Sequence, residues 1–176
     1  MTLLGRNGGQ DSVRGTSLDG IFLGLVVAKT DLDQLIQCGF DGYYTYFASD
    51  RFTYGSTSSN WASLAAQARQ MGVLFVPSVG PGYIDVRIRP WNTHNTRDRE
   101  LGAYFEREFA AAVDSHPDMI SITSFNEWHE GTQIEEAVLK QTADYRYADY
   151  SPADSDLYLK LSRKWTLAFA HQKLRQ

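Results

Sequence analysis

The sequence predicts an α/β fold built on a parallel sheet, and two features lead to this prediction. Short apolar or aromatic runs alternate four times with longer stretches whose apolar residues recur at helical spacing. In such an alternation, each helix returns the chain to the start of a parallel neighbouring strand. Polar and aromatic residues also directly follow three of the four runs, at the strand ends where parallel α/β folds place their active sites.

The first two strand–helix units follow an irregular lead-in. Residues 1–18 are rich in Gly, Ser, Asp and Arg, which is typical of turns. The continuous apolar run 21–27 predicts a strand buried on both faces. Thr30 is then predicted to cap a short helix. The aromatic and β-branched run 43–47 predicts the second strand, and the spacing of apolar residues in 59–71 predicts the second helix.

The third and fourth units are signalled in the same way. Gly72 is predicted to end the second helix, and residues 73–76 form the third strand, stopped by Pro77. An amphipathic stretch over 101–112 predicts the next helix, and residues 119–122 predict the fourth strand.

The last helix has a strong start signal. Ser151 is predicted as its cap and Pro152 as its first residue, with apolar residues from Leu157 to Phe169 forming its buried stripe. Four such units amount to half of an eight-fold (β/α)8 barrel, and a doubly wound open sheet is the alternative. The long loops that follow the third and fourth strands favour the barrel.

The composition describes an ordered globular chain of one domain. It has 176 residues, 43% of them hydrophobic and 22% charged, which is enough for a sizeable core. Its net charge of −4 argues against nucleic acid as a partner, which would require a basic surface. The longest apolar run, 21–27, is far too short to span a membrane. A single cysteine, Cys38, excludes an internal disulfide.

The run 124–135 after the fourth strand carries the densest chemistry. Glu127 and Glu130 are three residues apart, so a helical turn would place them on one side. Two carboxylates in different surroundings can act as acid and base, and glycoside hydrolysis most often uses such a pair. We therefore expect both side chains to converge on one pocket at the strand-end rim. The competing interpretation is a solvated helix face.

Aromatic and polar residues around this pair suit a sugar ligand. Trp128, Tyr83 and Trp91 offer flat rings for stacking, and Arg89 and Asn126 offer hydrogen bonds to hydroxyl groups. Core packing remains the more common role for any single ring.

Other chemistries fit the sequence less well. His129 and Glu130 could begin a zinc-binding helix, but position 133 is Gln where the second His is required. His129 is more simply a partner that holds one carboxylate. No Gly-x-Ser-x-Gly elbow is present, and the Gly-rich segment 78–82 has no phosphate-loop Lys.

Several blocks resemble the endo-α-1,2-mannosidases, glycoside hydrolase family 99. The signature run is Ser-Ile-Thr-Ser-Phe-Asn-Glu-Trp-His-Glu-Gly-Thr-Gln-Ile-Glu at 121–135. Further blocks occur in the right order at 39–49, 60–64, 77–85, 89–92, 95–97 and 157–159. The likeness extends from about residue 19 to the C-terminus, so 19–176 is predicted to be a partial glycoside hydrolase catalytic domain.

The resemblance implies the C-terminal half of a (β/α)8 TIM-type barrel and endo-acting cleavage of α-mannosidic linkages. The implied substrate in animals is a glucosylated high-mannose N-glycan, cut in the Golgi. The residue matching Glu127 would deprotonate the sugar's own 2-hydroxyl, giving a 1,2-anhydro sugar with retention. The residue matching Glu130 would serve as acid on the leaving oxygen and then as base on water. No metal or cofactor is implied.

The resemblance also implies a set of sugar-binding residues. Tyr46 and Arg89 match positions that hold the reacting mannose. The other expected binding residues are Tyr83, Asn126, Trp128 and His129.

The chain departs from the family in length. It matches only the C-terminal half of a family catalytic domain, and the N-terminal half of the barrel and the animal enzymes' membrane anchor are missing from it. Four units leave two unpaired strand edges and a bare inner face. We therefore expect this chain to be inactive, or nearly so, by itself. A non-catalytic mannose-oligosaccharide-binding remnant and an unrelated, metal-assisted barrel hydrolase are the alternatives.

Overall fold

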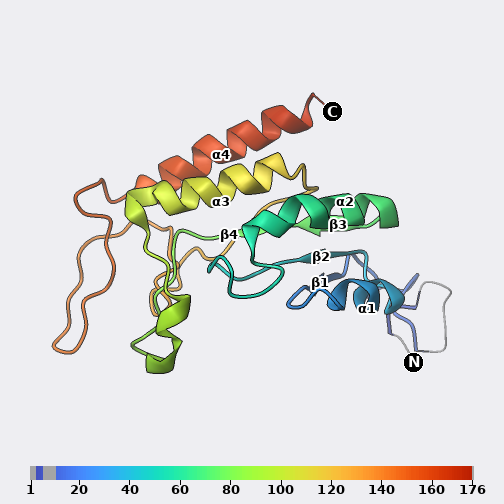
Figure 1. Ribbon diagram of the computed structural model, residues 1–176, viewed down its shortest axis with the longest axis horizontal. Coiled ribbons are helices and arrows are strands. Elements are labelled where there is room, and N and C mark those ends of the chain that lie inside the picture. The colour runs from blue at the N-terminus through green and yellow to red at the C-terminus, as the bar shows by residue number, and fades with distance from the viewer. Residues whose placement is uncertain (1–2, 6–10, 176) are drawn as a thin grey trace.

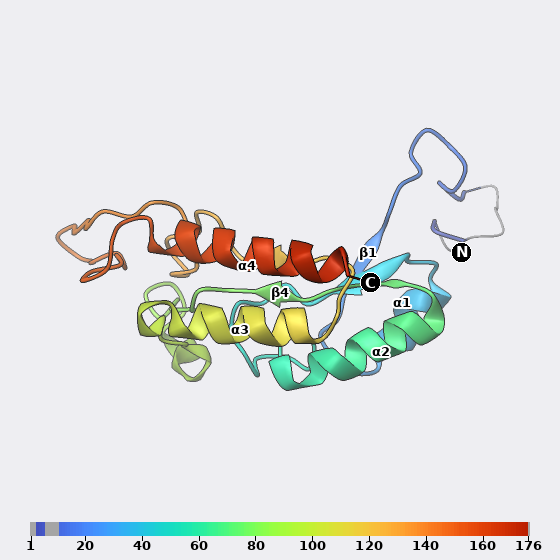
Figure 2. The same ribbon diagram turned by 90° about the horizontal axis from the view of Figure 1, so that it is seen from above.

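The computed structural model describes residues 3–5 and 11–175. Parallel strands lie side by side, with α2, α3 and α4 above them and α1 below them in the view of Figure 1. Figure 2 shows α3 and α4 running along the same segment of sheet, around β4.

The strands are β1 (Leu23–Leu25), β2 (Gly42–Tyr44), β3 (Leu74–Val76), β4 (Ser78–Val79) and β5 (Ser121–Ile122). The α-helices are α1 (Asp31–Gln37), α2 (Trp61–Met71), α3 (Ala103–Asp114) and α4 (Leu157–Lys173). Three 3₁₀ segments are η1 (Ser58–Asn60), η2 (Pro90–Asn95) and η3 (Glu100–Gly102).

The strands are parallel and adjacent in chain order. Leu23 pairs with Gly42, and Gly42 pairs with Leu74, in the sheet β1–β2–β3. Ser78 pairs with Ser121 in the sheet β4–β5. This sequential order lacks the reversal that defines a doubly wound sheet. The predicted fold class, an α/β chain carrying about four units of a (β/α)8 barrel, is confirmed.

β3 ends at Val76, directly before Pro77, so the prediction that this proline stops the third strand is confirmed. Pro77 separates β3 from β4, and the chain continues extended beyond it with a new pairing partner. Proline has no N–H to donate, but its carbonyl still accepts: the Ser121 amide donates to the Pro77 oxygen over 3.0 Å. Before Pro77 the chain pairs with β2 through β3, and after Pro77 it pairs with β5 through β4.

The core lies between the sheet and α2 and α3. The predicted helical stripe of α2 is confirmed, because Trp61, Leu64, Ala65 and Ala68 are all buried. α3 buries Phe105 and Phe109, whose rings pack edge to face 4.8 Å apart. Each such side chain contributes about 2 kcal/mol through burial. The glycine predicted to end α2, Gly72, is left-handed with φ 64°.

The observed strands are shorter than the predicted runs, and the predicted starts of α3 and α4 are wrong. α4 begins at Leu157 and not at Ser151, because residues 150–153 form a turn in which the Ala153 amide donates to the Tyr150 carbonyl. Leu101 lies in η3 with φ 50° and is 57% exposed, so it is not part of the α3 stripe.

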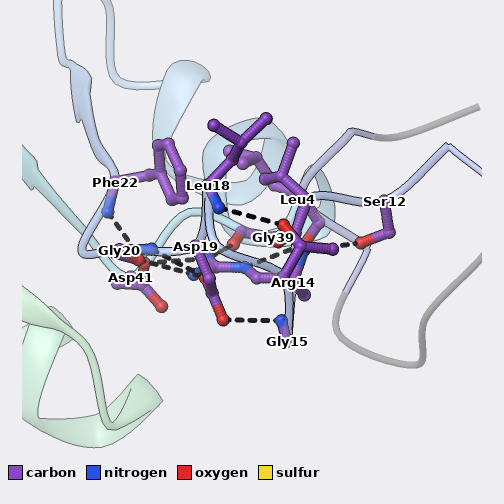
Figure 3. Close-up of polar contacts among 12 residues, drawn as sticks. Leu4, Ser12, Arg14, Gly15, Leu18, Asp19, Gly20, Phe22, Gly39 and Asp41 are labelled. Atoms are coloured by element: carbon purple, nitrogen blue, oxygen red, sulfur yellow. Dashed lines mark hydrogen bonds and ion pairs between the residues drawn. The ribbon is translucent and has the colours of Figure 1, made fainter.

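The described part of the lead-in, residues 3–5 and 11–18, is bonded to the segment between α1 and β2. Arg14 donates to the Gly39 carbonyl (2.6 Å) and to the Asp41 carboxylate (2.8 Å), as Figure 3 shows. It also pairs with Asp19 over 3.1 Å. The hydrogen bonds to Asp41 raise the pKa of Arg14. Within the described residues, no helix has both the length and the apolarity to cross a membrane.

Candidate active site

The loops that follow β2, β4 and β5 meet at one cavity of about 440 Å³. Tyr46 comes from the first of these loops, Tyr83 and Arg89 from the second, and Glu130 from the third. The cavity therefore lies at the carboxyl ends of the parallel strands, where α/β folds gather functional side chains. Four of the predicted site residues are thus brought together by segments far apart in the sequence.

Arg89 is the electrostatic centre of this cavity. One guanidinium nitrogen, Nη1, donates to Asp85 Oδ2 over 2.8 Å and to Glu130 Oε1 over 3.0 Å. Hydrogen bonds to Asp85 first, and then to Glu130, raise the pKa of Arg89. Arg89 therefore stays a cation and fixes the Glu130 carboxylate against the cavity wall.

Asp85 holds Arg89 in position through a hydrogen-bonded ion pair. Its side chain is fully buried and accepts hydrogen bonds from the Tyr83 hydroxyl (2.7 Å), Arg89 and the Asn92 amide (3.1 Å). Burial raises the pKa of Asp85, but these three donors lower it by more, so the net pKa lies below its ordinary value. The carboxylate stays ionised and holds Arg89 in place.

Tyr83 serves the site as a neutral donor. Burial, with the hydrogen bond to Asp85, raises its pKa above the ordinary value. Its backbone pairs with Arg97, with both N–H···O distances below 3.0 Å, which fixes the loop that carries it.

Glu130 is held through its backbone as well as its carboxylate. Its carbonyl accepts from the Ile84 amide over 2.8 Å. The next residue, Gly131, has φ 59°, and a Cβ there would lie 2.4 Å from the Ile84 side chain. Glycine is therefore required to bring the Glu130 turn against the loop of Ile84.

Glu127 has different surroundings. Its side chain is exposed, and its Oε1 accepts from the His129 backbone amide over 3.1 Å. Residues 124–131 form a non-helical turn, so the predicted helical face is wrong. The expectation that both carboxylates line one cavity is not met, because Glu130 lines this cavity and Glu127 does not.

The remaining predicted residues also lie outside this cavity. Asn126 is exposed at the turn. The Trp128 indole donates to Glu135 over 2.6 Å, and the His129 ring contacts Arg87 and not a carboxylate. Trp128 and His129 instead line a second cavity.

Several residues of the cavity were not singled out from the sequence. Asp85 carried a usable signal, since it precedes Arg89 by four residues in a loop after a strand. Phe47 and Phe52 form an aromatic wall with rings 4.9 Å apart, and Thr123 and Thr132 also line the cavity. Trp91, whose ring was predicted from the sequence to be available for stacking, is 76% exposed and does line this cavity. Within residues 3–5 and 11–175, no group of three His, Cys, Asp or Glu side chains is arranged to hold a metal ion.

Comparison with known proteins places this fold and site in a class, the glycoside hydrolases. The model of the family described as Glycosyl hydrolase family 99 matches residues 2–171. The chain therefore belongs to this family, which confirms the resemblance seen in its sequence.

Named relatives agree with the assignment. A mouse "Glycoprotein endo-alpha-1,2-mannosidase" is 52% identical over 166 residues, which cover 94% of this chain and 36% of the relative. A human "Glycoprotein endo-alpha-1,2-mannosidase-like protein" is 48% identical, with 94% and 36% covered. The solved GH99 endo-alpha-mannosidase of Bacteroides thetaiotaomicron, in complex with BIS-TRIS-propane, is 48% identical with a TM-score of 0.94. This match covers 99% of the chain and 54% of the bacterial structure, so the chain spans about a third of its curated relatives and about half of the solved one.

Proposed function

We propose that this chain supplies the two catalytic carboxylates of an endo-acting α-1,2-mannosidase. The observation that carries the proposal is the Glu130 carboxylate, fixed by Arg89 at a cavity that three strand-end loops build. The proposed substrate class is the glucosylated high-mannose N-glycan; the names of the curated relatives specify a glycoprotein and an α-1,2-mannosidic linkage. The site of action is the Golgi.

The proposed reaction proceeds in two inverting steps with net retention. In the first, Glu127 takes the proton of the mannose 2-hydroxyl, whose oxygen attacks C1 as Glu130 donates its proton to the leaving glycosidic oxygen. In the second, Glu130 takes a proton from water, which attacks C1 and opens the 1,2-anhydro ring, while Glu127 returns its proton to O2. Substrate-assisted schemes of this kind are recognised variants of the two-carboxylate mechanism.

The two carboxylates differ in how they are positioned. Glu130 has 26% of its side chain exposed and sits on a fixed cation, Arg89. Glu127 is exposed and free to meet a sugar hydroxyl that enters the open side of the turn. Fixing one group and leaving the other accessible lets the substrate itself complete the arrangement.

The activity is proposed to require the rest of the relatives' barrel, so that the chain by itself is inactive or nearly so. Its four units present free strand edges at β1 and β5 among the described strands. A chimera tests the proposal: this chain replaces the matching half of the Bacteroides enzyme, and products from α-1,2-linked mannose oligosaccharides are identified by mass spectrometry.

The chimera is expected to cleave the internal linkage, and Glu130→Gln should lower kcat about a thousandfold. A folded chimera that binds the oligosaccharide, and whose behaviour Glu130→Gln leaves unchanged, would indicate the non-catalytic binding remnant instead. Arg51→Gln is a matched control, because that side chain is 80% exposed and lies outside the cavity lining.

A further inference from the structure

Tyr46, which lines the cavity of Glu130, is held in a strained backbone conformation. Its φ is 61°, in the left-handed region that residues with a Cβ rarely adopt. The Phe47 amide donates to the Thr45 carbonyl over 2.8 Å, so Tyr46 is the central residue of a tight three-residue turn. A residue stays in such a conformation only where the surrounding structure imposes it.

The strand ladder does not hold this turn. β2 pairs with β3 only as far as its last residue, and β3 is followed by Pro77, which has no N–H to donate. Side-chain hydroxyls replace the ladder from this point. The Ser78 amide donates to Thr45 Oγ1 over 2.8 Å, and the Tyr46 amide donates to Ser78 Oγ over 2.7 Å.

The Ser78 hydroxyl is itself fixed. Ser78 is 1% exposed, and its Oγ lies 2.6 Å from the Oγ of Ser121, its pairing partner in the β4–β5 ladder. One hydroxyl can accept from the Tyr46 amide and still donate to Ser121. The Thr123 hydroxyl, directly after β5, donates to the Tyr46 carbonyl over 2.5 Å. Hydroxyls from the β4–β5 pair therefore bind both backbone polar groups of Tyr46.

From this network we infer that Ser78 is a positioning residue for the proposed cleavage: its hydroxyl holds the turn that presents the Tyr46 ring to the cavity of Glu130. The inference rests on the proposed function, since it takes this cavity as the site of cleavage. Tyr46 is 47% exposed, so its ring is available to a substrate and is not part of the core. The ring packs edge to face on Phe47, a residue of the same turn, at 5.3 Å, so ring and turn move together.

Ser78 has no direct access to a substrate, because it is almost fully buried and lies outside the cavity lining. Any effect of Ser78 on the reaction must therefore pass through a neighbour, and the bond to the Tyr46 amide identifies that neighbour. The alternative is a structural role, in which Ser78 only satisfies polar groups of the buried strands. The two roles differ in whether the loss of Ser78 depends on the Tyr46 ring.

The first measurement follows hydrogen exchange of the Tyr46 backbone amide in the full chain by NMR. Ser78→Ala removes the acceptor of this amide, which should exchange about tenfold faster or more. Ser115→Ala is the matched control, because Ser115 is also buried, at 3% exposed, and its hydroxyl donates to the Ala112 carbonyl over 2.7 Å, outside the cavity lining. The control should leave this exchange rate within about twofold of wild type.

The second measurement is a double-mutant cycle in the chimera with the Bacteroides enzyme. Ser78→Ala should lower kcat/KM for the oligosaccharide about tenfold. In the Tyr46→Ala background, where no ring remains to be positioned, it should lower kcat/KM by less than about twofold. Ser121→Ala, which keeps the Ser78 hydroxyl but removes its partner, is the second variant. It should cause a smaller loss, about threefold, with the same dependence on Tyr46.

The outcomes separate this inference from the proposed function. If the unsubstituted chimera cleaves the oligosaccharide but Ser78→Ala lowers kcat/KM equally with and without the Tyr46 ring, Ser78 is structural and the proposed function stands. Unchanged exchange of the Tyr46 amide in Ser78→Ala, or equal effects of Ser78→Ala and Ser115→Ala, would also overturn the inference. If the unsubstituted chimera does not cleave, the proposed function is wrong, and the role of Ser78 in the reaction is wrong with it.

Discussion

Glu130 and Glu127 are three residues apart, but their surroundings differ in kind. Glu130 is tied to Arg89, and through Arg89 to the fully buried Asp85, with Tyr83 and Asn92 completing the network. Glu127 is exposed and accepts one backbone hydrogen bond from its own turn. The first carboxylate is positioned by the protein, whereas the second is left for the substrate to engage. Substitutions near Glu130 should therefore change stability, and substitutions at Glu127 should not.

The largest effect is expected at Asp85. Asp85→Ala removes the acceptor for Arg89, Tyr83 and Asn92 from a fully buried position. The free energy of unfolding should fall by about 3 kcal/mol, reduced from the value for a wholly buried pair because Arg89 is 42% exposed. Urea unfolding of the chain measures it. A loss below about 1 kcal/mol would mean that water replaces these bonds and that Glu130 is not held in place.

The next effect concerns a third carboxylate, Glu108, which lies on α3 and is 5% exposed. Burial, and then the charge of Asp50, raise its pKa to about 8, against an ordinary value of 4.5. The folded state therefore keeps a proton that the unfolded state releases, so the free energy of unfolding is highest below pH 4.5 and falls as the pH rises to about 8.

Glu108→Gln removes this dependence. The variant should be about 4 kcal/mol more stable relative to wild type at pH 9 than at pH 5. Urea unfolding at both pH values tests this. If the free energies of unfolding of the two proteins change in parallel with pH, the pKa of Glu108 is not raised. Glu108 would then not support the contrast between buried and exposed carboxylates.

A smaller effect is expected where the arm, residues 136–150, meets the loop of Arg89. Arg87→Met removes an exposed cation from the Tyr145 ring and the donor to Tyr147. The stability should drop by no more than about 1 kcal/mol, while protease cleavage within residues 139–146 should become faster. Unchanged cleavage would show that the arm is held by other contacts. Lys160→Met, in an exposed ion pair on α4, is the control and should leave the arm protected.

The smallest effect is predicted at Glu127 itself. Glu127→Gln should alter the free energy of unfolding by less than about 0.5 kcal/mol, because the side chain is exposed. In the chimera with the Bacteroides enzyme, the same substitution should abolish cleavage. A large loss of stability would mean that Glu127 is structural, and the comparison with Glu130 would fail.

Much of this arrangement was readable from the sequence because it follows local rules. The apolar spacing of α2, the left-handed Gly72 and the parallel strands agree with the predictions. The position of Tyr46, Tyr83, Arg89 and Glu130 after strands also predicted that their loops meet. These features depend on periodicity and on the geometry of a parallel sheet, which the sequence encodes directly.

The rest depends on contacts between distant segments. Asp85 became the anchor of the site only because its loop packs against the turn of Glu130. Trp128 and His129 face the arm because Glu135 and Arg87 hold them there, which no local pattern reveals. The start of α4 moved to Leu157 because Tyr150 is buried under Tyr158, with rings 4.6 Å apart, and the Ser-Pro pair is drawn into a turn.

The most direct test of the account measures fluoride release from an α-mannosyl fluoride substrate by the chimera, since fluoride leaves without help from an acid. The account predicts that Glu130→Gln retains most of the first-turnover release from this substrate while losing cleavage of the oligosaccharide. Glu127→Gln should lose both. Equal loss of fluoride release in the two variants would contradict the separate roles given to these carboxylates.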